Sequence, residues 1–405
     1  MSRAWIAAVA LAAAACSGET TDPPRDAGTA RDGGASHDAG FADAGFRDAG
    51  TPDAGFEPLD PVDVPLDAPH ALLSSYNFFR LVDGRFVYNE RVVPYDLSTA
   101  LFSDFALKDR ALYVPTGTAA VYAERDAFEM PVGSAVIKSF SVAPDLRSPN
   151  VDRRIIETRV LVRTEEGWET YPYLWNEDGD ADYFVRGRVE TIEMIDPNGA
   201  PRTAQYLVPQ KNQCVECHEL EDETGDKYLT IVGPKARHLN RTFEYEGASL
   251  NQLVHLADLG MLDGLPPIDE VPQAFPLETL RDTSTTALDF ETLERAARDY
   301  LDINCAHCHN PAGTNGQTSR LYLDVHNTSA FNLGVCKEPG SAGGGAGGLR
   351  YDIVPGDADA SILVYRTETE NVGEMMPLLG RSLKHDLGAR VVRAWIDAMP
   401  PMSCN

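Results

Sequence analysis

The chain has 405 residues, and its 62 Asp and Glu against 35 Lys and Arg give a net charge of -27 at pH 7. A surface this acidic excludes nucleic acid as a partner, because the phosphate backbone is itself negative. It is compatible with a basic protein partner attracted by charge, and equally with an acidic surface that serves only to keep the chain in solution.

The first residues have the pattern of an export signal. Residues 1–15 carry one charge, Arg3, before an apolar run that is too short to cross a bilayer. Small residues then precede Cys16, as in bacterial lipoprotein signals, so Cys16 is predicted to carry the lipid. The alternative is an ordinary signal peptide with an incidental cysteine. The mature chain is expected to be an envelope lipoprotein that faces the periplasm, anchored to the outer membrane through lipid only.

Residues 16–65 form the next segment, in which Asp-Ala-Gly recurs at positions 26, 38, 43, 48 and 53. Short repeats of Gly, Ala and Asp offer almost no apolar surface to bury, so they favour an extended chain. This segment is predicted to be a disordered tether without chemistry of its own.

Residues 70–205 are predicted to be a β-rich domain. Strand-like runs lie at 85–88, 111–114, 134–138, 156–163, 168–175 and 187–195, and turn signals separate them. Short strands at this spacing are typical of a sandwich or a barrel. The region has no Cys, and its only His is His70, so it offers no evident catalytic set.

The pentapeptide C-x-x-C-H occurs twice, at residues 214–218 and 305–309. It is the attachment motif of c-type haem, because two thiols at this spacing can bond the two vinyl groups of a porphyrin while the adjacent His ligates the iron. Two matches in a chain with seven Cys predict two haem c groups. The attachment residues would be Cys214, Cys217, Cys305 and Cys308, and the axial ligands His218 and His309.

Residues 206–285 are predicted to be the first haem c segment. The sequence Gly233-Pro234 after the motif resembles class I cytochromes c, where the carbonyl group of such a pair accepts a hydrogen bond from the axial His. A helix is expected from the N-cap Ser249 to Gly260. The sixth iron ligand stays open among three candidates, and an iron without one would bind small molecules. These candidates are Met261, His255 and His238.

Residues 286–405 are predicted to be a class I cytochrome c-like domain. Asp289 is expected to cap a helix that leads directly to Cys305, and a second helix is expected from 387 to 399. Met376, before Pro377, is the expected distal ligand, with Met375 as the alternative. A thioether ligand opposite His raises the reduction potential.

Three further residues in this domain carry predictions. His307 lies inside the second motif and is expected to point away from the iron, at the surface. Cys336 and Cys404 are the cysteines that lipid and haem leave over, and they are predicted to form a disulfide in an oxidising periplasm. The alternative is two separate buried thiols.

The order of segments resembles a bacterial family of di-haem c-type cytochromes over residues 70–404. The resemblance implies electron transfer and the two haem segments described above. Its matching segments are Leu101-Phe102-Ser103-Asp104, Glu157-Thr158-Arg159, Tyr173-Leu174-Trp175-Asn176, Gly233-Pro234-Lys235-Ala236-Arg237, residues 304–311 and residues 352–356.

The sequence therefore predicts a multidomain α+β chain, with a β-rich N-terminal sandwich or barrel followed by two mainly α cytochrome c-like haem segments. The leading function is electron transfer between periplasmic redox partners, such as a dehydrogenase and a terminal acceptor. One alternative is a di-haem peroxidase or oxidase with a reactive first haem. Another is a pair of C-x-x-C-H sites that hold zinc or act as a redox disulfide pair.

Overall fold

The computed structural model describes residues 57–405 apart from residues 246 and 341–343. The predicted signal peptide, the lipidation residue Cys16 and most of the predicted tether lie outside the described residues. Within them, no helix is both long enough and apolar enough to cross a membrane. Residues 57–65 belong to the folded body, although the prediction included them in the tether: Asn89 Nδ2 donates a hydrogen bond to Asp60 O at 2.8 Å, and Val62 packs against buried side chains.

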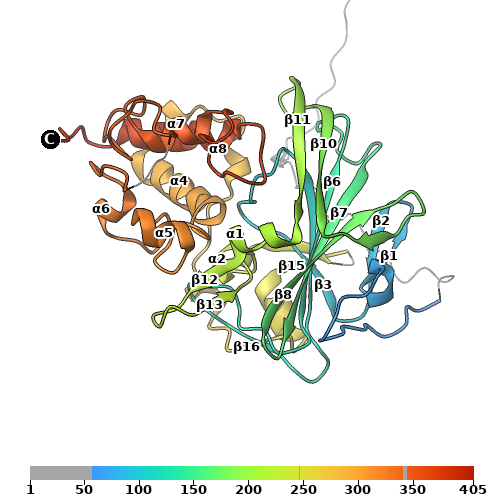
Figure 1. Cartoon of the computed structure of the whole chain (residues 1–405). Coiled ribbons are helices and arrows are strands. Elements are labelled where there is room, and N and C mark those ends of the chain that lie inside the picture. Colours follow the sequence, from blue (N-terminus) through green and yellow to red (C-terminus); the bar gives the residue numbers. More distant parts are fainter. Residues whose placement is uncertain (1–56, 246, 341–343) are drawn as a thin grey trace, which may run out of the picture. The chain divides into compact units, whose positions relative to one another are not determined.

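A six-stranded antiparallel sheet dominates the N-terminal part (Figure 1). Its two outer strands, β3 and β9, do not pair with each other, so the sheet is open and the predicted barrel is wrong for the described residues. The strands, in spatial order, are β3 (Val92–Tyr95), β4 (Leu107–Tyr113), β6 (Ala135–Val142), β7 (Arg154–Thr164), β8 (Gly167–Trp175) and β9 (Ala181–Tyr183).

Both faces of this sheet are covered. Val160 and its neighbours on one face pack against residues from the N-terminal segment, including Tyr76 in the 3-10 helix η1 (Leu73–Tyr76). Leu161, which alternation turns to the other face, packs against Ile231 and Leu253 from later in the chain. The chain that follows the sheet therefore folds back onto it, and this is how the first motif comes to face the strands.

The remaining strands form pairs. Four are antiparallel hairpins, and β5 with β16 is a parallel pair that joins residues far apart in the sequence. The hairpins are β1 (Phe79–Val82) with β2 (Arg85–Tyr88), β10 (Arg186–Ile195) with β11 (Pro201–Gln210), β12 (Glu219–Glu221) with β13 (Lys227–Leu229), and β14 (Thr242–Tyr245) with β15 (Ala248–Asn251); the parallel pair is β5 (Ala120–Val121) with β16 (Leu262–Asp263).

The predicted first haem segment, residues 206–285, is not mainly α. Its α-helices are short: α1 (Val215–His218), α2 (Ala236–Leu239) and α3 (Gln252–Asp258). The predicted helix after Ser249 begins later, because Ser249 lies in β15 and the side chain of Asn251 accepts the capping hydrogen bonds from Leu253 N and Val254 N. The α+β class is confirmed, but hairpins replace much of the helix expected here.

Helices dominate the C-terminal part. The helix α4 (Phe290–Asn304) begins after Asp289, whose side chain accepts a hydrogen bond from Thr292 N at 2.8 Å, as predicted. It packs against α8 (Asp386–Ala398), and the two lie next to each other in Figure 1. The shorter helices are α5 (Thr314–Ser319), α6 (Ala330–Leu333) and α7 (Ile362–Glu368).

A close approach fixes how α4 and α8 pack. A Cβ atom on Gly388 of α8 would lie 2.2 Å from Tyr300 Cζ of α4. Only a residue without a side chain fits there, so the sequence allows the two helices to approach at this point. Leu301 and Trp395 are fully buried in the core that the helices share.

A disulfide and a set of hydrogen bonds to Asp104 stabilise the C-terminal part. Cys336 and Cys404 form a disulfide with a Cα–Cα distance of 5.0 Å, the pair predicted from the sequence. The carboxylate of Asp104, from the loop before β4, accepts hydrogen bonds from Ser382 N and Ser382 Oγ and from Leu383 N, at 2.7 to 2.9 Å. Burial raises the pKa of Asp104, and these hydrogen bonds oppose the rise.

Candidate functional site

The first C-x-x-C-H motif forms a single helical turn, α1, directly after the β10–β11 hairpin. His218 N donates to Cys214 O at 3.0 Å, so the turn brings the first Cys and the His to the same side. His218 Nδ1 lies 2.8 Å from Thr230 O. A carbonyl acceptor at Nδ1 fixes that nitrogen as the donor and leaves Nε2 as the free ligand atom. The prediction gave this carbonyl role to the Gly233-Pro234 pair, but Thr230 has it.

The second motif continues from the end of α4. His309 N donates to Cys305 O at 2.9 Å, which repeats the turn of the first motif. Burial lowers the pKa of His309 to about 4, and burial also lowers the pKa of His218. Both rings are therefore neutral near pH 7, which is the form that ligates a metal.

Each motif faces its own cavity. The first cavity lies between Cys214, Cys217 and His218 on one side and the β-sheet on the other. The strands contribute apolar and aromatic groups, and they also contribute cations. The lining residues from the sheet and from β11 include Arg110, Val136, Lys138, Phe140, Arg159, Leu161, Tyr171 and Tyr206.

The second cavity lies mostly within the helical part, and Glu216 and Cys217 of the first motif also line it. Cys305, Cys308 and His309 line it, together with Met376 from the loop before α8. Met375, the alternative distal ligand, is 7% exposed and is not among the residues that line this cavity. The geometry therefore favours Met376 of the two methionines as the residue that faces His309.

None of the three predicted sixth ligands lines the first cavity. Met261 is 1% exposed and belongs to the core between the sheet and α3. His255 packs against the Tyr245 ring, with 4.0 Å between ring centroids. His238 is fully buried, and its Nε2 lies 3.7 Å from Asp302 Oδ2 on α4. The structure thus does not bring Met261, His255 or His238 to His218.

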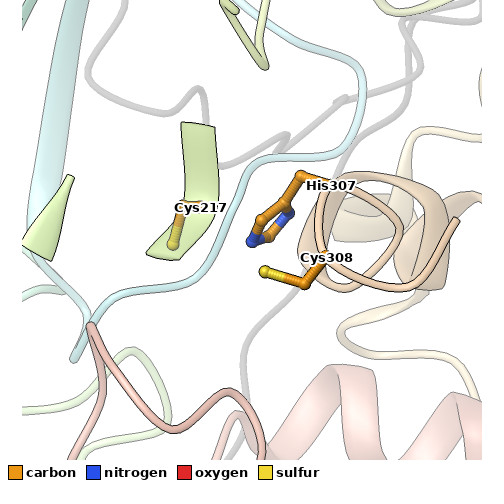
Figure 2. Close-up of side chains that lie close together, drawn as sticks. All are labelled: Cys217, His307 and Cys308. Carbon is orange, nitrogen blue, oxygen red and sulfur yellow. The ribbon is translucent and has the colours of Figure 1, made fainter. Parts of the chain in front are cut away.

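The two motifs meet at a junction of three side chains. Figure 2 shows the His307 ring and the Cys308 side chain pointing toward Cys217. One ligand atom from each of Cys217, His307 and Cys308 lies within 4.8 Å of the others. Cys308 Sγ also donates a hydrogen bond to Glu216 O at 2.9 Å. The prediction that His307 points to the surface is wrong, because its ring lines both cavities.

Ion pairs join the segment after the first motif to the helix before the second. Lys235 Nζ lies 3.2 Å from Asp302 Oδ2, and Arg237 Nη1 lies 2.5 Å from Asp299 Oδ1. Burial raises the pKa of Asp302, but Lys235 and His238 outweigh it and hold that pKa below its usual range. The segment 233–237 is therefore held against α4 by ion pairs, a role that its sequence alone did not indicate.

Sequence reasoning missed the cations of the first cavity, Arg110, Lys138 and Arg159. Lys138 is the one charge in strand β6, which is a usable signal because a charge on a buried strand face needs a partner, whereas Arg110 and Arg159 lie in strands with further charged residues. Which strands would pair, and in which register, could not be read from residues so far apart in the chain.

No family model matches the chain, and no curated protein and no solved structure matches it either.

Proposed function

We propose that the chain is a di-haem c-type cytochrome that transfers electrons, with one haem c in each cavity. The observation that carries the proposal is the juxtaposition of the motifs: each faces a cavity of its own, while Cys217 Sγ and Cys308 Sγ lie within 4.8 Å of each other. Bound haem would supply one-electron chemistry at its iron.

The donor set fits haem at both sites. Cys214 and Cys217 would hold the first group and His218 its iron, with Thr230 O keeping the imidazole oriented. Cys305 and Cys308 would hold the second group and His309 its iron. Met376 lines the second cavity and is the proposed distal ligand there, which favours a higher potential for the second haem.

The junction supports a short path between the two groups. A thioether sulfur lies at the edge of the porphyrin that it holds, so Cys217 and Cys308 would bring two porphyrin edges together. A ring nitrogen of His307 lies within 4.8 Å of both sulfur atoms, and His307 lines both cavities. Electrons would therefore cross from one group to the other through a few atoms, without passing through solvent.

The test is to produce the protein in a bacterial host that carries the haem-attachment machinery. We expect the intact mass to include two haems, and a redox titration followed by absorbance to resolve two one-electron steps. Protein matured in this way with no covalent haem would overturn the proposal.

A second candidate is an enzyme with a reactive first haem. It is favoured by one observation: Met261, His255 and His238 all lie outside the first cavity, so none of them is available opposite His218. A peroxidase or oxidase needs such an open position. A high-spin signal from one haem, with turnover of peroxide, would support the enzyme; two low-spin haems without turnover would exclude it.

A third candidate is a bare metal site at the junction. Cys217, His307 and Cys308 offer three ligand atoms, whereas structural zinc takes four and catalytic zinc takes three plus a water. Metal analysis distinguishes it from haem, because zinc without covalent haem would favour this site and iron at two atoms per chain would favour the cytochrome.

We also propose the location and partners expected from the sequence. Cys16 would carry a lipid that anchors the chain at the cell envelope, facing the periplasm, where a dehydrogenase and a terminal acceptor would be its redox partners. Labelling with a radioactive fatty acid tests the anchor: the wild type should be labelled and Cys16→Ser should not. An unlabelled wild type would contradict the anchor without affecting the haem proposal.

A further inference from the structure

Three cations form a row across the sheet where it lines the first cavity. Arg110 of β4 is the register partner of Lys138 of β6, and Lys138 is the register partner of Arg159 of β7. Register partners in an antiparallel sheet point to the same face, with Cβ atoms about 4.5–5.5 Å apart. All three residues line the cavity that also contains Cys214 and Cys217.

Such a row is unfavourable by itself, because like charges opposite each other on neighbouring strands destabilise a sheet. Nearby carboxylates balance its two ends. Arg110 Nη1 lies 2.9 Å from Asp96 Oδ1, and Arg159 makes two hydrogen bonds to Glu157, at 2.6 and 3.0 Å. Asp96 also pairs with Arg241, at 3.0 Å. The carboxylates of Asp96 and Glu157 therefore pair with the cations at the two ends of the row.

The middle of the row has no such partner. In the described part of the chain, no carboxylate oxygen lies within the 4.0 Å ion-pair distance of Lys138 Nζ. Lys138 Nζ instead lies over the Phe140 ring, 4.9 Å from the ring centroid. Burial lowers the pKa of Lys138 well below its usual value, Arg110, Lys108 and Arg159 lower it further, and Glu157 opposes this without reversing it. A bound anion would raise the pKa of Lys138 again, since a negative neighbour favours the charged ammonium.

We infer that Arg110, Lys138 and Arg159 form a carboxylate-binding wall of the first cavity, with Lys138 at its centre. The inference rests on the proposed function for its main ligand, the two propionate carboxylates of the first haem. A free small carboxylate that enters the cavity has the same chemistry and is the other source. Arg and Lys bind carboxylates through charge-assisted hydrogen bonds, which are roughly twice as strong as neutral ones.

Among the described residues, the second cavity has no comparable row of cations. Its charged lining residues are Arg366, Asp352 and Glu216. Arg366 donates to Glu374 O at 2.9 Å, and Asp352 pairs with Lys337 at 2.9 Å. The inferred wall thus distinguishes the first cavity from the second, in a chain whose overall charge is strongly negative.

The experiment compares Lys138→Met with Lys108→Met in the haem-loaded protein. Lys108 is a matched control, because it lies on the neighbouring strand β4, donates to Ala106 O at 2.7 Å and is not among the residues that line the first cavity. Haem content is measured first, and then the potential of each haem is titrated across pH with and without added succinate.

If propionate is the ligand, Lys138→Met should lower the potential of the first haem and move its pH-dependent step to higher pH, because a carboxylate without its cation binds a proton more readily. Lys108→Met should shift both by much less than Lys138→Met, because Lys108 does not line the cavity and acts on Lys138 only through its charge, and succinate should have no effect. If a free carboxylate is the ligand, succinate should shift the wild-type spectrum saturably, and Lys138→Met should bind it at least about tenfold more weakly.

The inferred wall is contradicted if the wild type and Lys138→Met have equal haem potentials and equal pH profiles and if neither binds succinate. That result would leave the proposed cytochrome function unaffected. If the matured protein carries no haem, the proposed function fails and the wall is tested on the haem-free chain. Calorimetry with succinate then decides: saturable binding that Lys138→Met abolishes supports the wall, and no binding to the wild type overturns it.

Discussion

The two motifs share a pentapeptide but differ in what surrounds them. The second follows α4, which packs on α8, and its cavity is lined mostly by residues between 304 and 379, with Glu216 and Cys217 of the first motif added. The first lies between two hairpins and faces a sheet whose strands precede it by many residues. The pentapeptide forms the same backbone turn in both places, while the rest of each site depends on what the fold brings opposite that turn.

The strongest way to separate the two sites is to remove the attachment thiols of one at a time. Cys305→Ala with Cys308→Ala should lose about half of the covalent haem and retain the haem attached at Cys214 and Cys217, because each porphyrin needs only its own thiols. Cys214→Ala with Cys217→Ala should instead retain the haem attached at Cys305 and Cys308 and lose the other haem. Intact mass and absorbance check this, and loss of both haems from either variant would contradict independent sites.

The next test removes Met376, the proposed distal ligand of the second site. Met376→Ala should lower the potential of the second haem, because the thioether that favours ferrous iron is lost, and it should leave the first haem unchanged. Met375→Ala is the control, since Met375 lies outside the cavity lining. A redox titration measures both variants. Equal shifts in the potential of the second haem from Met375→Ala and Met376→Ala would contradict the assignment of Met376 as the distal ligand.

A third test cuts the ion pairs that join the first site to the second. Asp302→Asn should cost about 3 kcal/mol at neutral pH, because it leaves Lys235 partly buried without its carboxylate. The folded pKa of Asp302 lies below its unfolded value, so its contribution is present above the unfolded pKa and is lost as pH falls toward the folded pKa.

Chemical unfolding from neutral to acidic pH measures the effect of Asp302→Asn. The wild type should lose stability in that acidic range, and Asp302→Asn should lose less, so the two curves converge at low pH. Curves that stay parallel would mean that the pairing of Asp302 with Lys235 contributes nothing to folding.

The smallest expected effect is at the contact of the two long helices. Gly388→Ala should destabilise the chain by about 1–3 kcal/mol, because the new Cβ meets the Tyr300 ring and α4 and α8 must separate. The second haem should respond in its absorbance before the first does. Gly388→Ala with Tyr300→Leu restores space and should recover most of the loss, as thermal unfolding would measure. No loss from Gly388→Ala alone would contradict this packing.

Much of the scaffold could be predicted from local pattern. The run 85–88 coincides with β2, the alternation at 156–163 lies within β7, and Asp289 caps α4 as expected. These features depend on neighbours a few residues apart, so the sequence carries them directly. The helix start at Asn251 was missed because Ser249, an equally good cap by residue type, lies in a hairpin that its sequence did not indicate.

The site could be predicted only in part, for a related reason. The cysteines and histidines of the motifs act through fixed local spacing. The position of His307, the exclusion of Met261 from the first cavity and the row from Arg110 to Arg159 depend on how distant segments pack. Cross-strand register has no local signature, and so no residue type at these positions could reveal its neighbours.

The contact at Asp104 has a consequence for how the chain can be divided. Asp104 holds the residues just after the Met376 loop, and Phe102 N donates to Asn304 Oδ1, one residue before Cys305, at 2.7 Å. A fragment that begins at residue 286 would keep the second motif and its helices but lose both of these partners. The C-terminal helical part therefore depends on contacts from outside it, and the smallest unit for engineering includes the loop before β4.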